Sequence, residues 1–173
     1  MNIKLCRKRF FVLMTVFMIA ALVALDQLTK YLATVYLAPV GTMPFIPGVL
    51  ELRFILNDGA AFSILAGNRW FLVVFTGIAL TALAIFLLWK KPKNRLAYFS
   101  LVLILAGGLG NLIDRILNGA VVDFFATTFM NFAVFNVADC FVCVGVAMLL
   151  IYVIADELKT SKANKQKKTH DDT

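Results

Sequence analysis

The sequence predicts an all-α membrane bundle of four transmembrane helices, with a small β element in the first outward-facing loop. Hydrophobic residues make up 61% of the chain and charged residues 16%, against roughly half and roughly a quarter in average globular proteins. Four long stretches contain no charged residue, and the positive charge gathers beside them. A water-soluble domain of 173 residues could not bury so much apolar surface, so lipid is the expected solvent.

The four uncharged stretches predict the spanning helices. A span needs about 20 mostly apolar residues. The second and third stretches meet this length directly, whereas the first and last do so only if the helix includes the neighbouring Asp26 or Asp139. We therefore expect one domain over residues 1–156, with helices at about 10–30, 70–89, 96–113 and 139–155.

The first stretch could also be a cleaved secretory signal peptide, because basic residues precede its apolar core. No small-x-small cleavage pattern follows, since Ala24-Leu25 runs directly into Asp26-Gln27. An uncleaved first helix is therefore the favoured interpretation.

Lysine and arginine orient the helices. The N-terminus, the 90–95 connection and the C-terminal tail are strongly basic, whereas segments 26–69 and 114–139 are not. Because cytoplasmic loops carry the excess of Lys and Arg, we expect both termini in the cytoplasm. Basic clusters can bind nucleic acid, but each one here adjoins an apolar stretch, so no nucleic-acid partner is expected. The Lys-rich tail at 157–173 is expected to be disordered and to contact membrane lipid.

The first outward-facing loop contains a strand-like segment. Prolines and glycines interrupt residues 39–48, and the segment 49–56 then alternates apolar side chains with Glu51 and Arg53. We expect a small β element at about 40–60, lying on the outer membrane surface.

Six acidic residues outside the tail all fall on the outward side of this topology: Asp26, Glu51, Asp58, Asp114, Asp123 and Asp139. Carboxylates near a membrane are costly and mark functional sites. Apolar neighbours raise a carboxyl pKa, and a second carboxylate raises one of the pair further. Asp123 and Asp139 each follow apolar residues and are the favoured pair, one to activate water and one to protonate a carbonyl. Asp114 is the third candidate.

The same residues permit other interpretations. Asp139 precedes the last helix and could simply cap it. Ser63 and Lys30 could form a serine–lysine pair, but nothing in the sequence brings them together. Zinc chemistry lacks ligands because the single histidine, His170, lies in the tail.

Two further alternatives remain. A proton-coupled transporter would favour a carboxylate near the middle of an apolar stretch, and the sequence has none. Cys140 and Cys143 form a C-x-x-C pattern at the start of the last stretch, and we interpret them as small buried side chains.

Five segments, in this order along the chain, resemble the lipoprotein signal peptidases, also called signal peptidase II. They are Asp26-Gln27-Leu28-Thr29-Lys30, Asn57-Asp58-Gly59-Ala60-Ala61-Phe62-Ser63, Gly107-Gly108-Leu109-Gly110-Asn111-Leu112-Ile113-Asp114-Arg115, Val121-Val122-Asp123-Phe124 and Phe135-Asn136-Val137-Ala138-Asp139. Glycines in the third segment should let its helix approach a neighbour closely.

The resemblance implies roles for ten residues. Asp123 and Asp139 would be catalytic; Asn57, Gly59, Asn111, Arg115 and Asn136 would bind substrate; Asp26, Lys30 and Asp114 would form a supporting polar shell. It also implies an aspartic endopeptidase that needs no metal or cofactor and is inhibited by globomycin.

The implied substrates are prolipoproteins whose cysteine carries diacylglycerol, cut on the amino side of that cysteine. The enzyme would be a multi-pass protein of the bacterial inner membrane, a monomer with its active site near the outer leaflet. The β element would be the family's cradle.

Overall fold

Four long helices, a π-helical turn and three strands make up the computed structural model, which describes residues 3–59, 65 and 67–171. In chain order they are α1 (Ile3–Leu32), η1 (Ala33–Leu37), β1 (Thr42–Ile46), β2 (Leu50–Asn57), α2 (Arg69–Lys90), α3 (Arg95–Leu117), β3 (Val121–Thr127) and α4 (Val137–Asp171). All four helices are long and apolar enough to cross a membrane, which confirms the predicted bundle.

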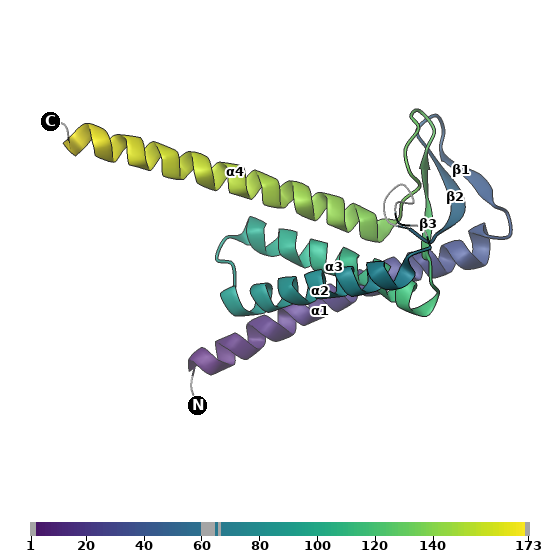
Figure 1. The fold of residues 1–173 in the computed structure, drawn as a ribbon, viewed down its shortest axis with the longest axis horizontal. Helices are drawn as coiled ribbons and strands as arrows, with labels where there is room; N and C mark the ends of the chain where they lie inside the picture. Colours follow the sequence, from purple (N-terminus) through teal and green to yellow (C-terminus); the bar gives the residue numbers. More distant parts are fainter. Residues whose placement is uncertain (1–2, 60–64, 66, 172–173) are drawn as a thin grey trace.

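The sheet stands beyond one end of the bundle (Figure 1). We call this end the sheet end. The N-terminus, the α2–α3 connection and the C-terminus lie toward the opposite end, and α4 diverges from the other helices as it runs there. This arrangement is therefore consistent with four membrane crossings that leave both termini on the same side.

Local chemistry explains where α2 stops and α3 starts. Lys91 adopts a left-handed conformation with φ 47°, directly before Pro92, which cannot continue a helix. Asn94 then accepts hydrogen bonds from the backbone N–H groups of Leu96 and Ala97, satisfying donors that the first turn of α3 leaves open.

Two helices are longer than expected. α1 begins at Ile3 rather than near residue 10, and α4 continues through the tail to Asp171, where we expected disorder. The tail is rich in Lys and contains neither Gly nor Pro. These residues favour continuation of a helix already started by the preceding span.

The three strands form one antiparallel sheet in the order β1-β2-β3. The first two strands lie in the loop where a β element was predicted. β3 was missed, because its apolar run shows no alternation of polar and apolar residues. Its register sets Asp123 opposite Ile55 and Val121 opposite Asn57.

The sheet is attached to α1 by a small apolar cluster. Ala33 and Leu37 of η1 pack there with Val122 and Phe124 of β3. Alternate residues of a strand face opposite sides, so Asp123 between Val122 and Phe124 points away from this cluster.

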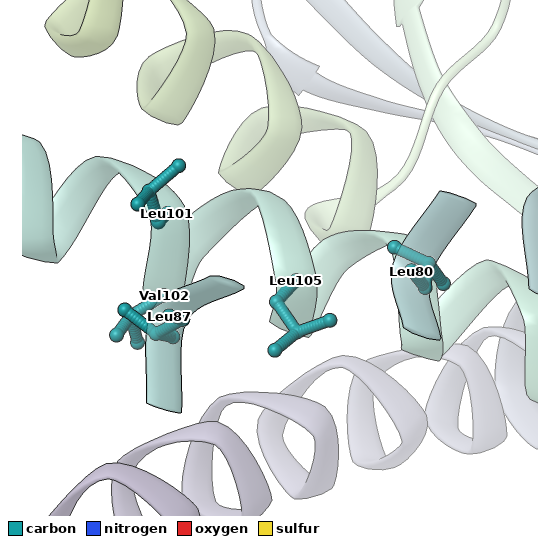
Figure 2. Close-up of a cluster of buried hydrophobic side chains, with 5 residues drawn as sticks. All are labelled: Leu80, Leu87, Leu101, Val102 and Leu105. Carbon is teal, nitrogen blue, oxygen red and sulfur yellow. The ribbon is translucent and has the colours of Figure 1, made fainter. Parts of the chain in front are cut away.

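Away from the sheet end, α2 and α3 pack through leucines and a valine. Figure 2 shows the five buried side chains: Leu80, Leu87, Leu101, Val102 and Leu105. Met18, Ile19 and Leu22 of α1 pack against them. In lipid such contacts act mainly through close van der Waals packing, which holds α1, α2 and α3 in register.

Glycines of α3 permit its close approach to α1 and α4, as expected. A Cβ on Gly110 would lie 2.5 Å from Oδ2 of Asp26, and one on Gly107 would collide with the carbonyl oxygen of Ala138. Bringing α1, α3 and α4 together here places their polar side chains in one cluster.

Candidate active site

Asp123 and Asp139 line the same pocket, of about 560 Å³, at the sheet end of the bundle. We call it the main pocket. Asp123 comes from β3 and is 2% exposed. Asp139 lies in the first turn of α4. Two carboxylates from separate elements therefore face one cavity.

Both oxygens of Asp123 accept hydrogen bonds from amides. Asn136 Nδ2 donates to Oδ1 at 2.7 Å, and Asn57 Nδ2 donates to Oδ2 at 2.9 Å. Burial raises the pKa of Asp123 to about 6; these hydrogen bonds oppose the rise, and the nearby Asp139 adds to it. The group therefore gains and loses its proton near pH 6 rather than in the range of an exposed aspartate.

Asp139 is held by a reciprocal pair of bonds with Asn136. The backbone N–H of Asn136 donates to Oδ2 of Asp139, and the N–H of Asp139 donates to Oδ1 of Asn136, both at 3.0 Å. Asn111 Nδ2 donates to the other carboxylate oxygen at 2.7 Å. This pairing is a capping box in which Asn136 is the N-cap and Asp139 is the third residue of α4. Asp139 therefore helps to cap α4, whereas Asp123 lies in a strand.

Asn136 links the two carboxylates. It is fully buried, and its Nδ2 lies 3.1 Å from Oδ1 of Asn111 as well as near Asp123. Asn111 in turn contacts Asp139. One connected set of amide hydrogen bonds thus joins Asp123 to Asp139 through Asn136 and Asn111.

A buried ion cluster lies behind this network. Lys30 Nζ is 2.9 Å from Asp26 and 3.0 Å from Asp114, and it donates to Oδ1 of Asn111 at 2.8 Å. All three charged side chains are at most 4% exposed. Asp26 also accepts the backbone N–H of Ala138 at 2.9 Å, which fixes the start of α4.

Gln27 belongs to this cluster and was not singled out from the sequence. Its Nε2 donates to Asp114 at 2.9 Å and to Asp26 at 3.2 Å. Adjacent helical residues do not share a face, so spacing gave no reason to group Gln27 with Asp26. The sequence did offer one signal for Gln27, because it lies in the first of the five segments described above, between Asp26 and Lys30.

Arg115 and Arg69 organise the end of α3. Arg115 donates to the carbonyl oxygen of Gly59 at 2.6 Å, while Gly59 N–H donates to Asn57. Arg69, also missed, donates to the backbone oxygens of Arg115 and Ile116 at 2.7 and 2.6 Å. These bonds satisfy carbonyl groups that a helix end leaves open.

The structure bears differently on the alternative site residues, the serine–lysine pair and the two cysteines. Ser63 lies outside the described residues, and Lys30 is occupied by Asp26 and Asp114. Cys143 is exposed and Cys140 only half-buried, so their predicted burial was wrong. Both line the main pocket, opposite residues of α2 and α3.

Comparison with known proteins identifies the family. The profile described as "Signal peptidase (SPase) II" matches residues 18–155. The chain belongs to the signal peptidase II family. Two lipoprotein signal peptidases of Streptococcus pyogenes, from serotype M2 (strain MGAS10270) and serotype M1, are each 43% identical over 152 residues, or 87% of this chain and 97% of each relative.

Solved structures agree with this membership of signal peptidase II. Two structures described as a bacterial membrane enzyme have TM-scores of 0.76 and 0.75, each at 34% identity. They cover 85% and 84% of this chain, and 91% and 96% of their own. The chain is therefore a membrane-embedded peptidase with four apolar spans.

Proposed function

We propose that this peptidase removes the signal peptide from diacylglyceryl-modified prolipoproteins, cutting on the amino side of the lipidated cysteine, with Asp123 and Asp139 as an aspartic catalytic pair. The observation that carries the proposal is the meeting of these two carboxylates, from β3 and α4, in one pocket. The names of the relatives supply the substrate class.

The chemistry is hydrolysis by an activated water. Because its pKa is raised to about 6, we assign the shared proton to Asp123. Asp139 takes a proton from water, the water oxygen bonds to the scissile carbonyl carbon, and Asp123 protonates the carbonyl oxygen. These steps give a tetrahedral intermediate with two hydroxyl groups on the former carbonyl carbon. When it collapses, the C–N bond breaks and the proton on Asp139 passes to the leaving nitrogen. Asp123 recovers its proton from one of the hydroxyl groups, which becomes the new carbonyl.

Substrate binding is assigned to the polar residues around the pair. A peptide bond within lipid must leave its helical hydrogen bonds before it can be cut, and its free backbone groups then need new partners. Asn57, Asn111, Arg115 and Asn136 supply amide and guanidinium groups beside the carboxylates, and Gly59 holds Arg115 in place. Asp26, Lys30 and Asp114 support that arrangement from behind.

Membrane position follows from charge. The basic N-terminus, α2–α3 connection and tail are assigned to the cytoplasm, which puts the sheet and both aspartates at the outer leaflet. A diacylglyceryl anchor holds its cysteine at the same depth. The enzyme is proposed to work as a monomer, without metal or cofactor, and to be inhibited by globomycin.

The test is cleavage by the purified full chain in detergent. A lipidated prolipoprotein and its unlipidated form are incubated with the enzyme, and the product masses are measured with and without globomycin. Cleavage of the lipidated form alone, immediately before the cysteine and blocked by globomycin, is the expected result. Equal cleavage of both forms, or a cut elsewhere, would contradict the proposal.

A further inference from the structure

A second pocket also reaches Asp123. This sheet-side pocket, of about 310 Å³, is lined by Ile55 and by residues 131–134, together with Asn57 and Asp123. The main pocket shares Asn57, Asp123 and residues 132–134 with it. Asp123 therefore lies where two cavities meet, and a bound chain could continue from one into the other.

The two pockets differ in the part of the molecule that forms them. Thr76, Gly108 and Val142 in the wall of the main pocket all belong to apolar spans. The lining of the sheet-side pocket comes from β2, β3 and the segment before α4, which lie outside those spans. The main pocket is thus formed in part by membrane-spanning segments, whereas the sheet-side pocket is formed entirely outside them.

A prolipoprotein has the same polarity. Its signal peptide is apolar and lies in lipid, whereas the mature chain continues into water. With the scissile bond at Asp123, signal-peptide residues occupy the main pocket, and mature residues leave past Ile55 and Asn131.

Side-chain alternation identifies which mature residue enters the sheet-side pocket. Successive side chains of an extended chain point to opposite sides, with about 3.3–3.6 Å between residues. The lipidated cysteine must direct its side chain toward the membrane. The residue directly after it then points away from lipid, at the depth of the sheet-side pocket.

We propose that the sheet-side pocket is a binding subsite for the second residue of the mature lipoprotein, directly after the lipidated cysteine. This inference rests on the proposed function. Ile55, Ala133 and Val134 give the subsite apolar walls. The exposed Asn131 is the polar side chain that lines this pocket and not the main pocket. The subsite fits an uncharged side chain, and a charge at position 131 should change which residue is preferred.

A charge exchange tests the assignment. Asn131→Asp is compared with the parent on lipidated prolipoproteins that carry Lys or Asp as the second mature residue. The ratio of kcat/KM for Lys over Asp should rise about fivefold, the effect of an exposed ion pair. Asn118→Asp adds the same charge at an exposed asparagine that lines neither pocket, and should leave the ratio unchanged.

A steric variant tests the same subsite without charge. Ile55→Trp should reduce cleavage of a substrate with Phe as the second mature residue far more than one with Ser. Leu56→Trp is the matched control, since Leu56 is 60% exposed and lines neither pocket. Equal losses for both substrates would count against the subsite.

The outcomes separate this inference from the proposed function. One contrary result is that the parent cleaves these substrates while the variants leave the kcat/KM ratios between them unchanged. Another is that the variants change these ratios only with the residue before the cut bond. Either result overturns the subsite alone. A parent that cuts none of these substrates overturns the proposed function and the subsite together.

Discussion

The sheet end and the opposite half of the bundle are held together by different interactions. At the sheet end, α1, α3, α4 and β3 meet through buried ions and amides around Lys30, Asn111 and Asn136. In the other half, α1, α2 and α3 meet through aliphatic side chains such as Leu87 and Leu105. Aliphatic packing tolerates exchanges that keep the side-chain volume, whereas a polar network loses both stability and geometry when one partner is removed.

The largest effect on stability is expected from Lys30→Met. The change leaves the buried carboxylates of Asp26 and Asp114 without their shared cation, which should cost about 3–5 kcal/mol. Thermal unfolding in detergent measures this loss. Lys90→Met, at an exposed position, should stay within about 0.5 kcal/mol of the parent. An unchanged Tm for Lys30→Met would refute the importance of the ion cluster.

The next effect depends on pH. Burial raises the pKa of Asp123 from 3.8 to about 6. Between these values the folded protein holds a proton that the unfolded chain has lost, so the free energy of unfolding should fall by about 2 kcal/mol as pH rises from about 4 to about 6.

Unfolding of Asp123→Asn over the same pH range checks this linkage. That variant should lack the fall, while Asp156→Asn, at an exposed carboxylate, should keep it. A fall that persists in Asp123→Asn would assign it to another group.

A smaller effect comes from helix packing. Gly110→Ala should cost about 1–3 kcal/mol, because the new Cβ would meet Asp26 Oδ2 at 2.5 Å and Ala138. At Gly77 a Cβ meets nothing within 4 Å, so Gly77→Ala should be neutral or stabilising by up to about 1 kcal/mol. Equal Tm changes for the two variants would show that the close approach has no energetic weight.

The smallest effect is expected in the aliphatic half. Leu87→Met keeps the side-chain volume and should cost less than about 1.5 kcal/mol, with cleavage retained. Asn111→Asp, similarly close in shape, should abolish cleavage by placing a third carboxylate between Lys30 and Asp139. Similar activities for the two variants would remove the contrast between the two halves.

Sequence reasoning recovered what depends on local pattern. Long apolar stretches predicted the spans, which the structure confirms. Carboxylates beside apolar residues singled out Asp123 and Asp139, which the structure brings to one pocket and whose catalytic role stays a prediction. The pairing of β3 with β2 escaped it, because a strand formed across about 65 intervening residues leaves no local mark. Gln27 and Arg69 were missed for a related reason: their partners lie on other helices or on backbone oxygens.

The central claim is that Asp123 and Asp139 act as one catalytic unit, and a double-mutant comparison tests it most directly. Single-turnover cleavage of a lipidated prolipoprotein is measured for Asp123→Asn, Asp139→Asn and the double variant, with Tm confirming that each folds. Residues that act together give non-additive losses, so each single variant should lose at least about 10³-fold and the double variant little more. Losses that multiply in the double variant, or near-parent activity in either single variant, would contradict the claim and make Asp114 the next candidate.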